Sequence, residues 1–175
     1  MPFAVTHVLL TIIAVDLYRD YVTKHKKYFP LHTIMLAGVG GLLSDTDIPV
    51  SLVLGALGYS HPLLQHGGIT HTLFFGLLFL VPGLLLWSRR KHKDAVVLFV
   101  IAFGVFFHVF LDVVVGGGGT NGVMAFWPLS DTLYKAHLIF RLGIEPHDAL
   151  AALDALLLLG WLWHEQTAHK VRDFV

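Results

Sequence analysis

The sequence predicts an all-α, polytopic integral membrane helical bundle of about five membrane segments, with a broken or re-entrant second segment, in one domain spanning residues 1–175. Hydrophobic residues make up 55% of the chain and charged residues only 14%, and the mean hydropathy is +0.70. Soluble domains carry about 25% charged residues, so this composition favours a membrane environment. The formal net charge is zero, which gives no basic field for nucleic acid as a partner.

Five apolar stretches approach the ~20 residues that a helix needs to cross ~30 Å of hydrocarbon. In chain order they are 3–18, 33–58, 69–87, 95–115 and 149–163. The first is short, and because no basic residue precedes Arg19 we interpret it as a retained helix rather than a secretory signal. The second is interrupted by "SDTDIP", where Pro49 removes a backbone donor. It is either one broken span or a re-entrant pair of half-helices.

Lysine and arginine residues predict the orientation. Four lie in 19–27, four in 89–93 and two in the tail 170–172, which is ten of the twelve. If the second stretch crosses, these three places share one side, and the positive-inside rule makes that side the cytoplasm. We therefore expect a multi-pass protein of the inner, cytoplasmic membrane, with 59–70 and 116–148 on the extracytoplasmic side.

Histidine and aspartate residues recur near the predicted extracytoplasmic ends of four different segments. An ionised carboxylate in a bilayer costs several kcal/mol unless it is paired or bound to metal. The chain has no cysteine, so a metal site must use nitrogen and oxygen ligands. We expect a metal or proton site toward the extracytoplasmic face, built from the residues His7, Asp45, Asp47, His66, His71, His108 and Asp112.

The spacing within the motifs agrees with ligand geometry. In "HVFLD", His108 and Asp112 are four residues apart and project from one helix face. The "DTD" stretch needs a non-helical or half-helical backbone if both carboxylates are to point the same way. In "HGGITH" the glycines permit close approach or positive φ, and Thr70 is placed to cap a helix that His71 begins.

Other polar residues have weaker signals. "GGGGTNG" is either a backbone nest for an anion or a flexible loop, and with Lys135 and Arg141 it gives a candidate substrate-binding set of Gly118, Asn121, Lys135 and Arg141. These residues would hold a phosphate or a lipid headgroup. We expect Asp16 near the cytoplasmic interface and Asp154 in an interhelical hydrogen bond. The histidines expected in solvated loops or the tail are His25, His92, His164 and His169.

Four blocks in order resemble the YdjM family of membrane-bound metal-dependent hydrolases. They are His7, "LLSDTDIP", "HGGITHTL" and "HVFLDVV" with a later "FWPLS", from His7 to Ser130. The family patterns are similar to L-P-D-x-D-H-P, H-R-G-x-T-H-S and H-x-x-L-D with W-P following. The resemblance implies an inner-membrane protein with metal ligands at the six residues His7, Asp45, Asp47, His71, His108 and Asp112, and His66 as a further ligand or a neighbour of the ligands.

Two positions depart from the family pattern. Ser44 stands where proline is usual, and Gly67 stands where arginine is usual. An arginine beside a metal site is a natural partner for an anionic phosphoryl group. Its absence weakens the expectation of a phosphate substrate unless Lys135 or Arg141 takes its place.

Histidine and carboxylate ligands suit one or two divalent transition-metal ions, Zn²⁺ before Mn²⁺. Such an ion lowers the pKa of a bound water and polarises a phosphoryl or acyl oxygen. Asp45, if it stays off the metal, is the candidate general base, and His66 is the second catalytic candidate. The sequence therefore predicts a hydrolase acting on a phosphoester or ester of a membrane lipid or lipid-linked substrate, similar to a phospholipase.

Two other classes stay open. A metal-ion or proton transporter also places histidine and aspartate at membrane depth, but we find no inverted repeat and expect no matching polar sites toward the cytoplasmic side. Because the histidines and aspartates cluster toward one face of the membrane, a catalytic site is favoured over a transport pathway. A non-catalytic membrane scaffold or regulator would use the same residues for helix pairing and predicts no bound metal.

Overall fold

The computed structural model describes residues 4–24, 27–115, 122–136, 138–141, 143 and 146–169. This described part is helical, and its one pairing of extended segments is an isolated bridge between Val123 and Tyr134. The predicted all-α class is therefore confirmed for these residues. The helices are α1 (Ala4–Leu17), α2 (Leu31–Leu43), α3 (Asp47–Ala56), α4 (Leu73–Ser88), α5 (His92–Val114), α6 (Leu138–Arg141) and α7 (Pro146–His169).

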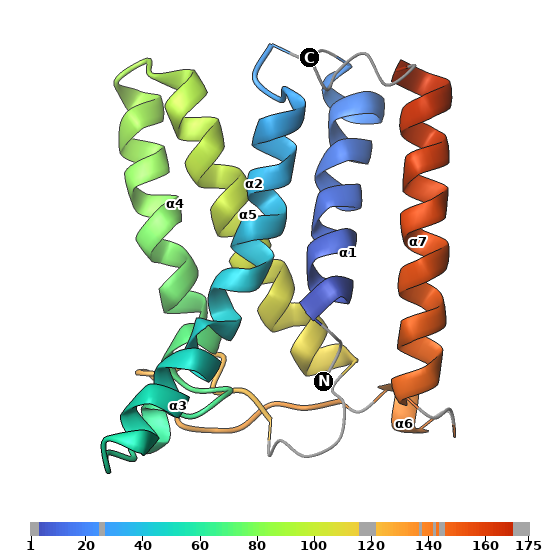
Figure 1. Cartoon of the computed structure of the whole chain (residues 1–175). Coiled ribbons are helices and arrows are strands. Elements are labelled where there is room, and N and C mark those ends of the chain that lie inside the picture. The colour runs from blue at the N-terminus through green and yellow to red at the C-terminus, as the bar shows by residue number, and fades with distance from the viewer. Residues whose placement is uncertain are drawn as a thin grey trace.

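The longer helices α1, α2, α4, α5 and α7 run along one common direction (Figure 1). The end of α1, the turn between α4 and α5, and the end of α7 lie at one end of the bundle. We call it the basic end, since Arg19, Lys24, Arg89 and Arg90 are there. The opposite end carries α3 and the segments 57–72 and 122–136, and we call it the loop end.

Within the described part of the chain, two helical stretches are long and apolar enough to cross a membrane, judged by length and composition. They are Leu31–Ala56, with 26 residues, and His92–Val114, with 23 residues. Helix α4 is apolar but has only 16 residues. Large apolar side chains on the outside of α4 and α7 are exposed, among them Leu78 (65%) and Trp163 (73%). A protein covers so much apolar surface with a partner or with lipid.

Helix α5 is the centre of the bundle and packs against α1, α2 and α4. Ile34 and Ala37 of α2 are fully buried, and they form one core with Val100 of α5 and Ile12 of α1. This packing aligns the loop ends of α1, α2 and α5, which carry the polar residues singled out above.

The second predicted segment is a broken helix and does not turn back. Helix α2 passes through a 3₁₀ turn, Ser44–Thr46, directly into α3, which continues toward the loop end (Figure 1). Pro49 is the third residue of α3, where its missing N–H costs nothing because first-turn donors have no intrahelical partner. The backbone at "DTD" stays helical, as a 3₁₀ turn followed by the start of α3, so of the two expected forms it is the half-helical one.

The expectation that Thr70 caps a helix begun by His71 is wrong. Ile69–His71 form a separate 3₁₀ turn, and α4 begins at Leu73. Thr72 is the N-cap, with φ −107° and ψ 152°, and its hydroxyl accepts a hydrogen bond from Phe75 N at 3.0 Å. The chain needs one extended residue between the two turns, and β-branched Thr72 suits that backbone.

The close contact of α2 and α5 leaves no room for a side chain at Gly104. A Cβ there would meet Ala37 O and lie 2.6 Å from Gly41 N. We expect Gly104→Ala to lower the free energy of unfolding by about 1–3 kcal/mol, as overpacked cores do, in thermal unfolding followed by circular dichroism in detergent. Gly160→Ala is the control, because nothing lies within 4 Å of that Cβ. Equal stability of Gly104→Ala and wild type would contradict the close approach.

Candidate metal centre

The structure brings all seven predicted histidine and aspartate side chains together at the loop end. The contributing elements are α1 with His7, the 3₁₀ turn and α3 with Asp45 and Asp47, the segment 57–72 with His66 and His71, and α5 with His108 and Asp112. His7, His71 and His108 are fully buried. The side chains of Asp45 and His66 are 16% and 18% exposed, so the cluster opens toward these two residues.

Four ligand atoms face one another at the centre of this loop-end cluster. Nε2 of His71 and Nε2 of His108 are 3.2 Å apart, and Asp112 Oδ2 is 3.3 Å from each. Asp45 Oδ1 is 3.8 Å and 3.6 Å from the same nitrogens. A tetrahedral Zn²⁺ with bonds of ~2.0–2.1 Å separates its ligand atoms by about 3.3 Å. His71, His108 and Asp112 therefore have the spacing of ligands to one ion, and Asp45 Oδ1 lies a few tenths of an ångström farther out.

The tautomers of the two central histidines follow from their other ring nitrogens. Nδ1 of His108 is 2.6 Å from the carbonyl oxygen of Gly41, and Nδ1 of His71 is 3.1 Å from Asp47 Oδ2. Both oxygens only accept, so each Nδ1 carries a hydrogen, and in the neutral ring each Nε2 presents a lone pair. Two lone pairs facing each other in a buried site are stable only with a cation or a proton between them.

Asp47 lies behind the two histidines of the "HGGITH" turn. Besides His71, it accepts hydrogen bonds from His66 Nδ1 at 3.0 Å and from the backbone N–H of Gly67 at 3.2 Å. Carboxylates that bind the outer nitrogen of a ligating histidine fix its tautomer and its direction. Asp47 is therefore placed to fix the ring orientations of His66 and His71.

Gly67, the position where the family pattern has arginine, has φ +88°. A Cβ there would lie 2.8 Å from the carbonyl oxygen of Gly122. Both the backbone conformation and the lack of space favour glycine. The departure from the family pattern is therefore built into the local backbone of this chain.

Several buried polar atoms of the cluster have no hydrogen-bond partner among the described residues. They are both ring nitrogens of His7, Asp45 Oδ1, His66 Nε2 and both carboxylate oxygens of Asp112. Buried polar atoms without partners are rare because they are costly. His7 Nε2 is 3.5 Å from Asp112 Oδ1, so the donor set has room for one ion or two, the second near His7.

The candidate substrate residues are placed less completely. Gly118 and Asn121 lie outside the described residues, and Arg141 is exposed at the end of α6. The backbone N–H of Ala136, next to Lys135, donates to Val113 O at 2.6 Å. The segment 122–136 therefore runs beside the end of α5, close to Asp112.

The expected absence of polar sites toward the basic end is wrong, and so is the assignment of His164 and His169 to solvated positions. Nε2 of His164 and Nε2 of His169 lie 3.0 Å and 2.8 Å from Asp20 Oδ2. Asp16, expected at an interface, is fully buried beside Arg19. The sequence signal for this second group was the spacing of Asp16, Arg19 and Asp20, which places them on one helix face.

Asp154 makes the expected interhelical bond, accepting from Thr6 Oγ1 at 3.0 Å.

A family model described as YdjM inner membrane protein matches residues 1–171, as the resemblance of the motifs predicted. No curated protein and no solved structure matches the chain.

Proposed function

The chain belongs to the YdjM inner membrane protein family, and from this premise we propose that it is a multi-pass membrane hydrolase whose loop-end cluster binds a divalent metal ion. In this proposal α1, α2 with α3, α4, α5 and α7 all cross the membrane. The basic end is cytoplasmic, as the positive-inside rule requires. The loop-end cluster then lies toward the extracytoplasmic face.

The observation that carries the proposal is the approach of His71 Nε2 and His108 Nε2 to 3.2 Å, beside Asp112 Oδ2. Asp45 completes a four-ligand set, and His7 offers a ligand to a second ion. The nitrogen and oxygen donors suit Zn²⁺ first and Mn²⁺ second. When bound, the ion polarises the scissile phosphoryl or acyl oxygen and acidifies a coordinated water.

Proton transfer is assigned to His66. Its Nδ1 donates to Asp47 Oδ1, so Nε2 is the basic nitrogen, and the side chain lies on the open side of the cluster. His66 takes the proton of the attacking water and returns it to the leaving group. Asp45 borders the same open side, with its Oδ1 3.9 Å from His66 Nδ1.

The depth of the loop-end cluster along the helices agrees with a substrate bond in a membrane lipid. His7 is the fourth residue of α1, and Asp112 lies two residues before the end of α5. At ~1.5 Å per residue, both are about 3–5 Å inside the helix ends. Ester and phosphoester groups of lipids lie near that level, and Lys135 and Arg141 are the proposed contacts for an anionic headgroup.

Metal content tests the centre. We expect full-length protein purified in detergent and equilibrated with Zn²⁺ or Mn²⁺ to hold at least one equivalent of metal by elemental analysis. His71→Ala and Asp112→Ala should each hold about one equivalent less than wild type, because each removes a ligand atom from the loop-end cluster. Asp131→Asn, at an exposed aspartate, should not, and circular dichroism checks that all variants fold. If the wild type binds neither ion, both the metal site and the proposed hydrolase activity are refuted.

Hydrolysis in mixed micelles tests the reaction. With metal-loaded wild type we expect release of phosphate, headgroup or fatty acid from one class of phospholipid, followed by mass spectrometry. His66→Gln should keep its metal and lose a factor of ~10²–10⁴ in rate, as loss of a general base does. His61→Gln is the matched control, an exposed histidine in the same segment. A metal-loaded wild type inert toward every phosphoester and ester tested would refute the hydrolase.

Transport is the second candidate, favoured by polar residues along the α1–α7 contact between the two ends. Asp154 is bound by Thr6, and Asp16 Oδ2 accepts from Trp161 Nε1 at 3.1 Å. We read these contacts as ties between helices and expect no flux of Zn²⁺ or protons into proteoliposomes carrying indicator dyes. A flux lost in Asp16→Asn and Asp154→Asn would place transport ahead of hydrolysis.

A further inference from the structure

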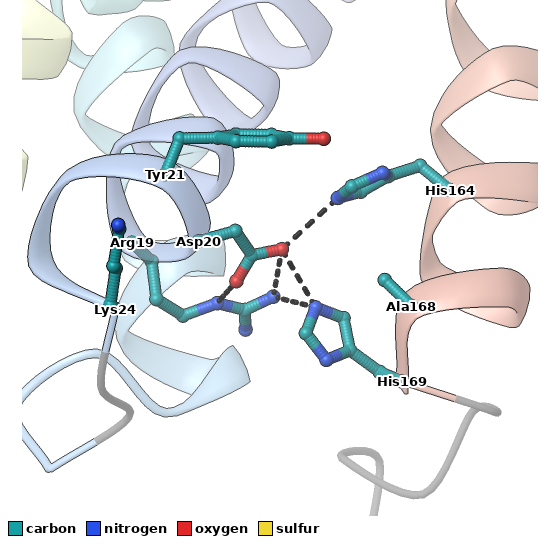
Figure 2. A pocket seen from close by; sticks show the side chains of 7 residues that line it. All are labelled: Arg19, Asp20, Tyr21, Lys24, His164, Ala168 and His169. Atoms are coloured by element: carbon teal, nitrogen blue, oxygen red, sulfur yellow. Dashed lines mark hydrogen bonds and ion pairs between the residues drawn. The ribbon is translucent and has the colours of Figure 1, made fainter.

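A second cluster of histidine and charged side chains lies at the basic end, where α7 meets the end of α1 (Figure 2). A π-helical turn, Tyr18–Thr23, follows α1 and supplies Arg19 and Asp20. The last turns of α7 supply His164 and His169 from across the interface. These side chains line an open pocket of about 430 Å³ together with Tyr21, Lys24 and Ala168.

Asp20 is the focus of this basic-end cluster. Its Oδ2 lies 3.0 Å from His164 Nε2 and 2.8 Å from His169 Nε2, while Arg19 Nε donates to Oδ1 at 2.7 Å. Two imidazole nitrogens and one guanidinium therefore surround a single carboxylate.

His169 has two incompatible neighbours. Its Nε2 lies 2.8 Å from Asp20 Oδ2 and also 2.8 Å from Nη2 of Arg19. A guanidinium only donates and a carboxylate only accepts, so one ring nitrogen cannot satisfy both. With a cation between Asp20 and the two histidines, the carboxylate and both imidazoles present lone pairs to the ion, and Arg19 Nη2 turns from His169 to Asp16 and Glu165.

Arg19 has buried carboxylate partners besides Asp20. Its Nη2 lies 2.6 Å from Asp16 Oδ1 and 3.1 Å from Glu165 Oε1, and all three side chains are 1% exposed or less. The same Nη2 donates to Asp20 Oδ2 only at 3.4 Å, so Asp16 and Glu165 can bind the guanidinium if that contact opens. The guanidinium also orients Asp20 through Oδ1, as carboxylate partners behind metal sites are oriented.

The three ligand atoms have the spacing of a metal site. They lie within 4.8 Å of one another, and the 2.8 Å and 3.0 Å contacts need to open by a few tenths of an ångström to reach the separation of about 3.3 Å around tetrahedral zinc. The side chains of Asp20, His164 and His169 are 14%, 22% and 9% exposed. Water from the pocket can fill a fourth position.

We propose that Asp20, His164 and His169 bind a divalent transition-metal ion, Zn²⁺ above others, which clamps the end of α7 onto α1. This site is independent of the proposed hydrolase, since it shares no residue with the loop-end cluster and lies at the opposite end of the bundle (Figure 1).

The polar contacts between α7 and α1 give the clamp its purpose. Leu156, Leu159 and Trp163 are 64–73% exposed, and the recorded bonds between α7 and α1 are polar, from Thr6–Asp154 at one end to Arg19–Glu165 at the other. Apolar helix faces gain little from one another in lipid, so polar bonds and small-residue packing decide the pairing. A metal bond to both helices would be the strongest of these ties.

The absence of cysteine makes distance measurement by spin labelling direct. Labels at Val22→Cys and Gln166→Cys, both exposed positions beside the cluster, report the α1–α7 distance in the full-length protein by pulsed electron paramagnetic resonance. We expect that Zn²⁺, added to protein from which EDTA has removed metal, narrows the distribution of α1–α7 label distances. His164→Gln with His169→Gln should abolish the narrowing and remove about one equivalent of zinc in elemental analysis.

Two controls separate this site from the loop-end cluster and from general effects of histidine removal. His71→Ala should lose loop-end zinc and keep the narrowing. His32→Gln, at an exposed histidine of the first turn of α2 at the basic end, should behave as wild type. Unchanged zinc content and an unchanged zinc response in the double variant would overturn the proposal. If the double variant does not fold, the wild type alone still tests the proposal. A distribution of α1–α7 label distances that zinc does not alter would overturn it.

Discussion

The close approach of α2 and α5 is the constraint on which the loop end depends. A Cβ at Gly40 or Gly104 would run into the backbone of the facing helix, so only glycine lets the two helices come this near. The contact brings the carbonyl of Gly41 to 2.6 Å from His108 Nδ1. That bond fixes which ring nitrogen faces the cluster, and so the helix packing sets the chemistry of the site.

Histidine–carboxylate pairing organises both ends of the bundle, in different arrangements. At the loop end Asp47 lies behind His66 and His71, and their remaining nitrogens are left for other partners. At the basic end Asp20 itself lies between His164 and His169, with Arg19 behind it. A chain without cysteine has only nitrogen and oxygen donors for metal binding, and here they gather where helix ends meet.

Helix α1 connects the two clusters. Its buried face carries His7 at the loop end and Asp16 toward the basic end, with Thr6 and Thr11 between helices. The partners differ: His7 stacks on His108 of α5 with ring centroids 3.8 Å apart, whereas Asp16 binds Trp161 of α7. One helix is thus shared by the central bundle and by the peripheral α7.

The sequence by itself determined the helical class, the family and the set of seven loop-end residues, because hydrophobic periodicity and the i, i+4 spacing of His108 and Asp112 are local properties of the backbone. It did not determine that Asp47 faces His66 and His71, or that Thr72 rather than Thr70 caps α4, since both depend on where the 57–72 segment folds back. The basic-end cluster was missed altogether. Asp20 and His164 are 144 positions apart, and only the packing of α7 against α1 decides that they meet.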